Sequence, residues 1–293
     1  MDTRILGHYR QYGLFTYPGL YEDYLKTLPD DVKELGELLR KNFLHRTTLE
    51  AGNVGTNADL KYGDMTKMPW WRQSEDDNLV TTTAMLAEFF RRDPKGLTMK
   101  KSVEDKLVLT CRNVAILMAS ILKAKGTPAR VRSGFAAYFE GTKDAWDHWV
   151  NQYWNESENR WVTIDVDGSW HRTGFDMYDM PGGKFDFSAD AWLDVRQGKR
   201  DSKHFRNAGG FDGLVCIAWE LFYDFHCLMN SEIIYLHHPI PVMLNNFKNL
   251  SEEKLNETDH LAELMKNPDE NFDELKTTWE KNKDFRLLGG ALL

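Results

Sequence analysis

Three side chains near the middle of this sequence are of the types that nucleophilic acyl transfer requires. Cys111 supplies a thiol, His148 an imidazole and Asp165 a carboxylate. In such chemistry a thiolate attacks a carbonyl carbon, an imidazole takes the thiol proton and returns it to the leaving group, and a carboxylate orients the imidazole. Whether these three residues act together depends on the elements that carry them.

Cys111 stands at the start of a helix predicted over residues 111–125. This stretch contains no Gly or Pro, and its apolar residues recur at steps of three and four, at Val114, Leu117, Met118, Ile121 and Leu122. A lone cysteine beside an apolar helix is usually a small core residue. A helix start changes that balance, because the positive end of the helix dipole favours the thiolate, whereas an ordinary cysteine has a pKa of about 8.5.

Three strands are predicted after this helix, and two of them carry the histidine and the aspartate. Alternating apolar residues, or a high content of Trp, Val, Tyr, Thr and Ile, mark residues 129–139, 148–154 and 160–166. The polar residues 155–158 predict a turn between the last two strands. A helix followed by an antiparallel run of strands indicates an α+β domain.

The predicted hairpin gives His148 and Asp165 a common face. If Trp154 pairs with Asn159 across a four-residue turn, His148 lies directly opposite Asp165, with Cβ atoms about 4.5–5.5 Å apart. Any turn of even length keeps the two side chains on one face, whereas a bulge would not. A carboxylate beside an imidazole fixes its tautomer and stabilises its protonated form.

Each of these residues also has a structural interpretation. A lone histidine on a strand is more often a structural group than a base, and Asp165 is typical of a residue that ends a strand. Asp147 and Asp167 compete for the orienting role, although Asp147 points to the opposite face and Asp167 lies farther along. The set of thiol, imidazole and carboxylate on these elements nevertheless favours nucleophilic catalysis.

Five short blocks surround these residues, at positions 110–115 (TCRNVA), 126–130 (GTPAR), 134–135 (GF), 147–150 (DHWV) and 160–165 (RWVTID). In order and spacing they resemble the successive blocks of the transglutaminase-like superfamily, which also has the order Cys, His, Asp. The resemblance covers residues 79–166. Residues 190–198 and the later apolar helix resemble extensions in a bacterial branch of cysteine proteases and amidases.

The resemblance implies a papain-like core, in which the helix that carries the cysteine packs on an antiparallel sheet. It implies a triad of Cys111, His148 and Asp165, and thiol-dependent hydrolysis or acyl transfer through a thioester, as in proteases, amidases, deamidases and transglutaminases. The expected substrate is a peptide, a protein or another amide. The metal-binding cysteines of the peptide N-glycanase branch are absent, and so are the extra domains of animal calcium-dependent enzymes, so no metal or cofactor is expected.

An oxyanion intermediate would need two hydrogen-bond donors. The backbone N–H of Cys111 is one, and Trp70, Trp71 or Gln73 is a candidate for the other, although the alternative interpretation of these three residues is loop packing. Leu109 and Thr110 stand where many relatives have a glycine just before the cysteine, so the local turn there departs from the family pattern.

Other charged residues are interpreted as structural. The acidic run Glu75–Asp77 is typical of a solvated turn or helix start. Arg130 and Arg132 project from one side of a strand, where ion pairs with acidic residues are expected rather than a substrate contact. Cys216 and Cys227 lie eleven residues apart in an apolar helix and are expected in the core.

The sequence predicts three parts. They are a helical and loop extension over residues 1–78, a catalytic core over 79–213 and a helical extension over 214–293. Helices are predicted at 30–45, 79–92, 188–197 and 214–235 and in the charged tail from residue 251, and residues 49–73 are predicted to be mostly loop.

Composition limits the possible functions. The 293 residues are 42% hydrophobic and 28% charged, with a formal charge of −8. This acidic balance argues against nucleic-acid binding and against docking on anionic membranes. The sequence has no run of 18 apolar residues and begins without a long apolar stretch, so neither a membrane span nor a secretory signal is expected. Three widely spaced cysteines favour a reducing cytoplasm over a disulfide framework.

A second interpretation comes from another class of protein. The domain could bind peptides or partners with little or no catalysis, because a fold does not guarantee chemistry. An open cleft with Cys111 at its base and His148 in reach would favour an enzyme. A Cys111 buried beneath residues 167–213 would favour binding or a gated enzyme.

Overall fold

The computed structural model describes residues 1–47, 68–139, 143–170, 173–243 and 250–289. The fold is α+β, as predicted. The chain divides into two compact units, of which the first comprises residues 1–131 and 149–181 and the second comprises 132–148 and 182–293. The predicted division into three parts stays a prediction. Within the described ranges, every helix is too short or too polar to cross a bilayer.

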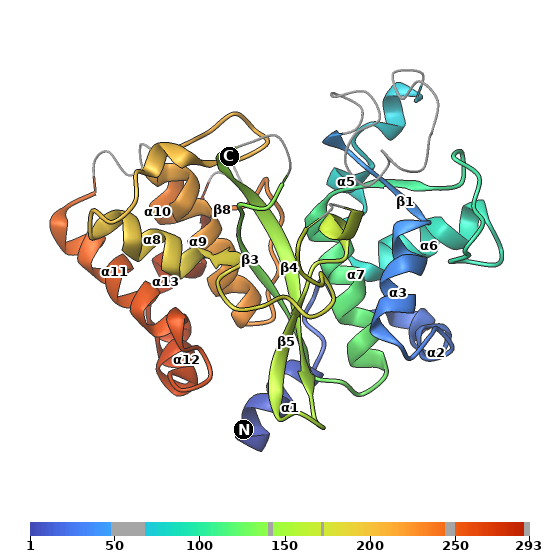
Figure 1. Cartoon of the computed structure of the whole chain (residues 1–293), viewed down its shortest axis with the longest axis horizontal. Coiled ribbons are helices and arrows are strands. Elements are labelled where there is room, and N and C mark those ends of the chain that lie inside the picture. The colour runs from blue at the N-terminus through green and yellow to red at the C-terminus, as the bar shows by residue number, and fades with distance from the viewer. Residues whose placement is uncertain (48–67, 140–142, 171–172, 244–249, 290–293) are drawn as a thin grey trace. The chain divides into compact units, whose positions relative to one another are not determined.

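The main sheet has the strand order β5-β4-β3-β6, and β7 also pairs with β4 (Figure 1). Its β5–β4 and β3–β6 pairs are antiparallel and its β4–β7 pair is parallel. The strands are β3 (Ala129–Ala136), β4 (Ala145–Asn155), β5 (Arg160–Ile164), β6 (Phe185–Phe187) and β7 (Phe205–Arg206). The three predicted strands are therefore confirmed with shifted ends. Residues of β3 and β4 belong to both units, since the boundary falls within each of these strands.

The first unit is built around α7 (Cys111–Ala124), whose residues are all buried. The helix begins at Cys111 as predicted, and it ends before Gly126, which adopts a φ of +81°. Asn151 of β4 donates from Nδ2 to the Ala115 carbonyl at 2.8 Å, which joins the helix to the first strand of the β4–β5 hairpin. The expected packing of the cysteine-bearing helix on the sheet is therefore observed.

Further helices and a short sheet complete the first unit. The helices are α1 (Thr3–Arg10), α2 (Glu22–Lys26), α3 (Val32–Arg40), α5 (Glu75–Asn78) and α6 (Thr82–Arg92), with 3₁₀ turns η1 (Gly19–Tyr21), η4 (Trp70–Arg72) and η5 (Asp167–Trp170). Strand β1 (Phe43–His45) pairs in parallel with β2 (Leu107–Leu109), which places His45 opposite Leu109. Strand β2 therefore leads directly to Thr110 and the start of α7.

The helix predicted over residues 30–45 is too long. Helix α3 ends at Arg40, and the chain continues as β1. The buried Asn42 ends the helix, since its side chain donates to the Leu38 carbonyl at 2.6 Å and the Thr98 carbonyl at 2.9 Å and accepts from the Thr98 N–H. Most of the loop predicted over residues 49–73 lies outside the described residues.

The second unit is mainly helical (Figure 1). Its helices are α8 (Ser188–Arg196), α9 (Leu214–Leu228), α10 (Ile240–Met243), α11 (Glu252–Lys266), α12 (Phe272–Lys281) and α13 (Lys283–Arg286); β8 (His238–Pro239) pairs with β9 (Leu288–Gly289), and Ser202–His204 form a 3₁₀ turn. Helix α8 contacts both α9 and α11. Helix α9 ends earlier than the predicted residue 235, since Asn230 adopts a φ of +54°. Helix α11 confirms the helix expected in the charged tail, and Ser251 caps it by accepting from the Lys254 N–H.

Arginines on β3 are satisfied internally. Arg132 forms two 2.8 Å bonds to Asp224 of α9, which confirms the expected ion pair. Arg130 donates to Gln152 at 2.8 Å and lies over the Trp161 ring at 4.1 Å, and its expected ion pair stays a prediction. Every residue of β3 is buried, and both arginines therefore serve packing.

Candidate active site

The start of α7 is fixed by its own first turn. Thr110 caps the helix, and the Asn113 side chain accepts from the Thr110 backbone N–H at 3.2 Å and from its hydroxyl at 2.7 Å. Asn113 also donates to the Leu79 carbonyl at 3.0 Å. Cys111, the first residue of the helix, is 7% exposed. The free N–H groups of a first turn and the helix dipole both favour a thiolate at this position.

Arg112 is a residue that the sequence reasoning missed. Its side chain is almost fully buried, with the guanidinium 4.9 Å from the Phe15 ring centroid and 5.9 Å from that of Trp149. It also donates to the Val80 carbonyl at 3.3 Å. The residue that follows Cys111 in the helix therefore carries a buried positive charge. Its adjacency to Cys111 in the sequence was the available signal.

The predicted register of the hairpin is wrong by two residues. Trp154 pairs with Trp161 and not with Asn159, and the ladder runs from Asn155↔Arg160 to Asn151↔Ile164. The Asn155 side chain selects this turn, since its oxygen accepts from the Ser157 N–H at 3.1 Å and hydroxyl at 2.7 Å. Asn159 then closes the turn with a φ of +50°. In this register His148 and Asp165 are not direct cross-strand partners, and the role of Asp165 stays a prediction.

Asp165 is fully buried one residue past β5 and is held by a tight turn. Its backbone N–H donates to the Met177 carbonyl at 2.8 Å, and its Oδ1 accepts from the Gly168 N–H at 2.7 Å. A Cβ atom on Gly168 would collide with the Asp165 carboxylate, so this turn requires a glycine. The carboxylate is consequently positioned by backbone within the first unit.

Asp167, the competitor for the orienting role, lies in the same turn but has a different imidazole nearby. Its Oδ2 is 3.4 Å from Nε2 of His45, and both side chains are largely buried. The other ring nitrogen of His45 lies 2.8 Å from the Thr47 hydroxyl. His45 lies in β1, where it pairs with Leu109 of β2, the strand before Cys111. The contact therefore connects this short sheet to the turn that carries Asp165.

His148 lies on the part of β4 that belongs to the second unit, immediately before Trp149 of the first unit. It is 2% exposed, and its ring makes an edge contact with Phe139 at a centroid distance of 5.0 Å. The first unit thus contains Cys111 and Asp165, and the strand that connects the units carries His148.

The three oxyanion candidates lie around η4. Trp70 and Trp71 are 80% and 61% exposed, and their rings meet edge to face at 6.3 Å. Gln73 follows the turn, and its side-chain amide donates to the Met68 carbonyl at 3.2 Å. The Gln73 side chain therefore packs within the loop, as the alternative interpretation expects, whereas the two indoles face solvent.

The acidic run after η4 is a helix start, one of its two expected interpretations, but it is not solvated. Glu75 and Asp76 are buried, and they begin the short helix α5. Arg46 donates to Asp76 at 3.0 Å and to Asp77 at 3.1 Å. Burial raises the pKa of Asp76, although the Arg46 charge opposes this effect. Basic partners from distant parts of the sequence explain why this run is buried.

The remaining cysteines and histidines that the structure describes include three buried side chains on α9. Cys216 and Cys227 form no disulfide and are fully buried on α9, as predicted, and burial raises the pKa of Cys216. Burial likewise lowers the pKa of His226 to about 4. Within the described residues, no group of three or more His, Cys, Asp and Glu side chains is placed to hold a metal ion.

Comparison with known proteins supports the family resemblance. Residues 90–166 match the family model of the transglutaminase-like superfamily, which confirms the predicted resemblance for this segment. Cys111, His148 and Asp165 all fall within it. A solved structure, a proposed cysteine protease from Cytophaga hutchinsonii, is similar at 12% identity with a TM-score of 0.34, over 65% of this chain and 50% of that one. The chain thus spans half the length of that protein. No curated protein matches the chain.

Proposed function

We propose that this chain is a cysteine-dependent hydrolase or acyltransferase that acts on amide or peptide bonds. Cys111 is its nucleophile, His148 its general base and Asp165 the group that orients the base. The observation that carries the proposal is the position of Cys111, the first residue of a buried helix with a fixed cap, inside the segment that matches the transglutaminase-like superfamily. The proposed substrate is a peptide, a protein or another carboxamide.

The proposed reaction begins with transfer of the Cys111 thiol proton to His148. The thiolate then attacks the carbonyl carbon, and the resulting oxyanion accepts a hydrogen bond from the Cys111 N–H. One of Trp70, Trp71 and Gln73 supplies the second donor. When the carbon–nitrogen bond breaks, His148 gives its proton to the departing amine, which leaves a thioester on Cys111. His148 then deprotonates a water molecule or an amine, which attacks the thioester and releases the thiolate.

Two structural features support these roles. The buried Asp165 carboxylate is held by the Gly168 N–H, so it would orient an imidazole without side-chain rotation of its own. The buried guanidinium of Arg112 favours the thiolate form of Cys111. A preformed site of this kind reduces the reorganisation that the reaction requires.

The test is the pH dependence of alkylation by iodoacetamide, measured at each cysteine by peptide mass spectrometry. The proposal predicts that Cys111 reacts faster than a model thiol below pH 8, and that His148→Ala slows it. The fully buried Cys216 and Cys227 are internal controls that report unfolding. If Cys111 reacts no faster than the model thiol and His148→Ala makes no difference, the activated pair does not exist.

A second function is favoured by one observation, the burial of both Cys111 and His148. A domain that binds peptides or partners without catalysis would keep these two side chains buried, and so would a gated enzyme. Peptide binding that persists in a Cys111→Ala variant, without turnover by the wild type, would establish this alternative. Three cysteines without a disulfide fit either function in a reducing cytoplasm, which is the proposed compartment.

A further inference from the structure

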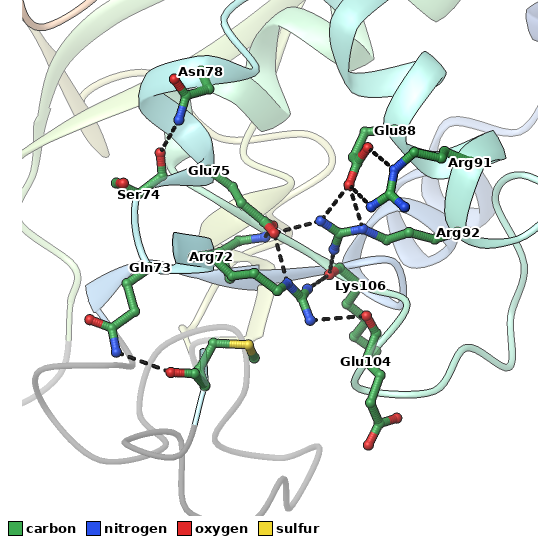
Figure 2. Close-up of polar contacts among 12 residues, drawn as sticks. Arg72, Gln73, Ser74, Glu75, Asn78, Glu88, Arg91, Arg92, Glu104 and Lys106 are labelled. Carbon is green, nitrogen blue, oxygen red and sulfur yellow. Dashed lines mark hydrogen bonds and ion pairs between the residues drawn. The ribbon is translucent and has the colours of Figure 1, made fainter. Parts of the chain in front are cut away.

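The Glu75 carboxylate is the centre of a buried ion-pair cluster in the first unit (Figure 2). Its Oε1 accepts from Nε of Arg72 at 2.7 Å and from a guanidinium nitrogen of Arg92. Its Oε2 accepts from the backbone N–H of Val108 at 2.8 Å. One side chain therefore joins η4, α6 and β2, three elements that are separate in the sequence.

The two arginines hold the main chain that precedes β2. Arg92 donates to the Lys106 carbonyl at 2.6 Å, and Arg72 donates to the same carbonyl. Arg72 also donates to the Glu104 carbonyl at 3.0 Å. Together with the Glu75–Val108 bond, these contacts fix the backbone at three positions between residues 104 and 108.

This backbone leads directly to the candidate nucleophile. Val108 lies in β2, which ends at Leu109, and Cys111 begins α7 two residues later. On the opposite edge, β1 pairs with β2, and the Arg46 N–H donates to the Leu109 carbonyl at 2.9 Å. The side toward η4 and α6 is held by Glu75 and its arginines. The place where the helix begins is therefore set by hydrogen bonds on both sides of a three-residue strand.

Stability alone does not explain a buried ion-pair cluster of this kind. The side chains of Glu75 and Arg92 are 8% exposed and that of Arg72 is 11% exposed, so the charges have lost most of their hydration. Such buried pairs are often no more stabilising than apolar residues of the same size, yet removing one partner leaves an uncompensated charge. What such pairs provide is a fixed geometry, and a nucleophile and its oxyanion donor require one.

We infer that Glu75 is a positioning residue for Cys111, which holds β2 so that the first turn of α7 presents the thiol and its N–H to the substrate carbonyl. The same carboxylate, through Arg72, holds η4, the turn that carries the tryptophan candidates for the second oxyanion donor. That this positioning serves catalysis rests on the proposed function. The bonding that it requires is independent of catalysis.

The experiment compares Glu75→Gln with Glu88→Gln. Glu88 contacts Arg91 and Arg92 on the outer side of the cluster, so its loss leaves the Glu75–Val108 and Glu75–Arg72 bonds in place. A glutamine at position 75 offers one acceptor where three donors converge. Two quantities are measured in the full chain: amide hydrogen exchange over residues 106–113, and the pH profile of Cys111 alkylation with Cys216 and Cys227 as markers of unfolding.

We expect Glu75→Gln to speed exchange over residues 106–113, to slow Cys111 alkylation at pH 7 by about tenfold or more, and to move its pH profile toward that of an ordinary thiol. Glu88→Gln should leave both quantities at wild-type values. If Glu75→Gln fails to fold, Arg72→Lys is the second variant, since a lysine keeps the charge but does not reach Glu75 and both carbonyls at once. It should shift both quantities in the same direction by a smaller amount.

A folded Glu75→Gln protein with wild-type exchange and a wild-type alkylation profile would overturn the inference. Equal effects of Glu75→Gln and Glu88→Gln would overturn it as well, because the charge of the cluster and not the bond to β2 would then matter. Failure of the proposed function looks different. In that case Cys111 of the wild type reacts like a model thiol, while faster exchange in Glu75→Gln still shows that the carboxylate holds the start of α7.

Discussion

Replacing Gly168 by alanine should disturb Asp165 specifically. An alanine Cβ at this position would clash with one carboxylate oxygen of Asp165, and it would lie 2.9 Å from the Cγ and 3.2 Å from the other oxygen. These atoms belong to a fully buried side chain, so the carboxylate must move or the turn must open. Overpacking of a tight interior site costs about 1–3 kcal/mol. Weakening the 2.7 Å bond from the Gly168 N–H to a charged acceptor adds about 1.5–3 kcal/mol.

The assay has a matched control in the same segment. Gly174 has nothing within 4 Å of a built Cβ, so Gly174→Ala should leave the free energy of unfolding nearly unchanged. Urea unfolding of the two variants gives the stability difference. If Asp165 orients the base, a displacement of about 1 Å should also lower the rate of acyl transfer about a hundredfold in Gly168→Ala. Equal stability and equal rates in the two alanine variants would refute this account of the turn.

Three other perturbations have expected outcomes. Arg112→Met should raise the apparent pKa of Cys111, because it removes a buried positive charge, and the pH profile of alkylation measures this change. Asn113→Ala should lower the free energy of unfolding by about 0.5–2 kcal/mol, since the cap of α7 loses its bonds to Thr110; the urea midpoint measures it, and no shift would argue against the cap. The pKa of His226 is lowered to about 4 from 6.5, chiefly by burial, so the unfolded chain takes up a proton first as the pH falls. Stability should therefore be full above pH 6.5 and fall by on the order of 3 kcal/mol between pH 6.5 and 4, a slope that His226→Gln should remove.

The start and end of α7 were predictable because local signals specify them. The apolar steps from Val114 to Leu122 mark a buried helix, and Gly126 supplies the positive φ that ends it. The register of the following hairpin was not predictable in the same way. Two four-residue turns that differ by one position have nearly the same composition, and the choice between them depends on hydrogen bonds from the Asn155 side chain.

Burial of the acidic run had only one local signal, Arg72 three residues before Glu75. Glu75 is buried because Arg92, seventeen residues later, and the Val108 N–H, thirty-three residues later, both reach it. Such partners depend on the tertiary fold, and a charged run in isolation is best interpreted as solvated. The same limit applies to Asn42, whose bonds to Thr98 end a helix that the apolar pattern alone would extend.

The central claim is that Cys111 forms a thioester with a carboxamide or peptide substrate. Activity profiling of the wild type and Cys111→Ala on a library of amides and peptides tests it most directly, with release of ammonia or amine as the signal and intact-protein mass spectrometry to detect the acylated enzyme. The account predicts turnover by the wild type, an acyl adduct that maps to Cys111, and neither in Cys111→Ala. Undiminished turnover by Cys111→Ala, or an adduct on another residue, would contradict it.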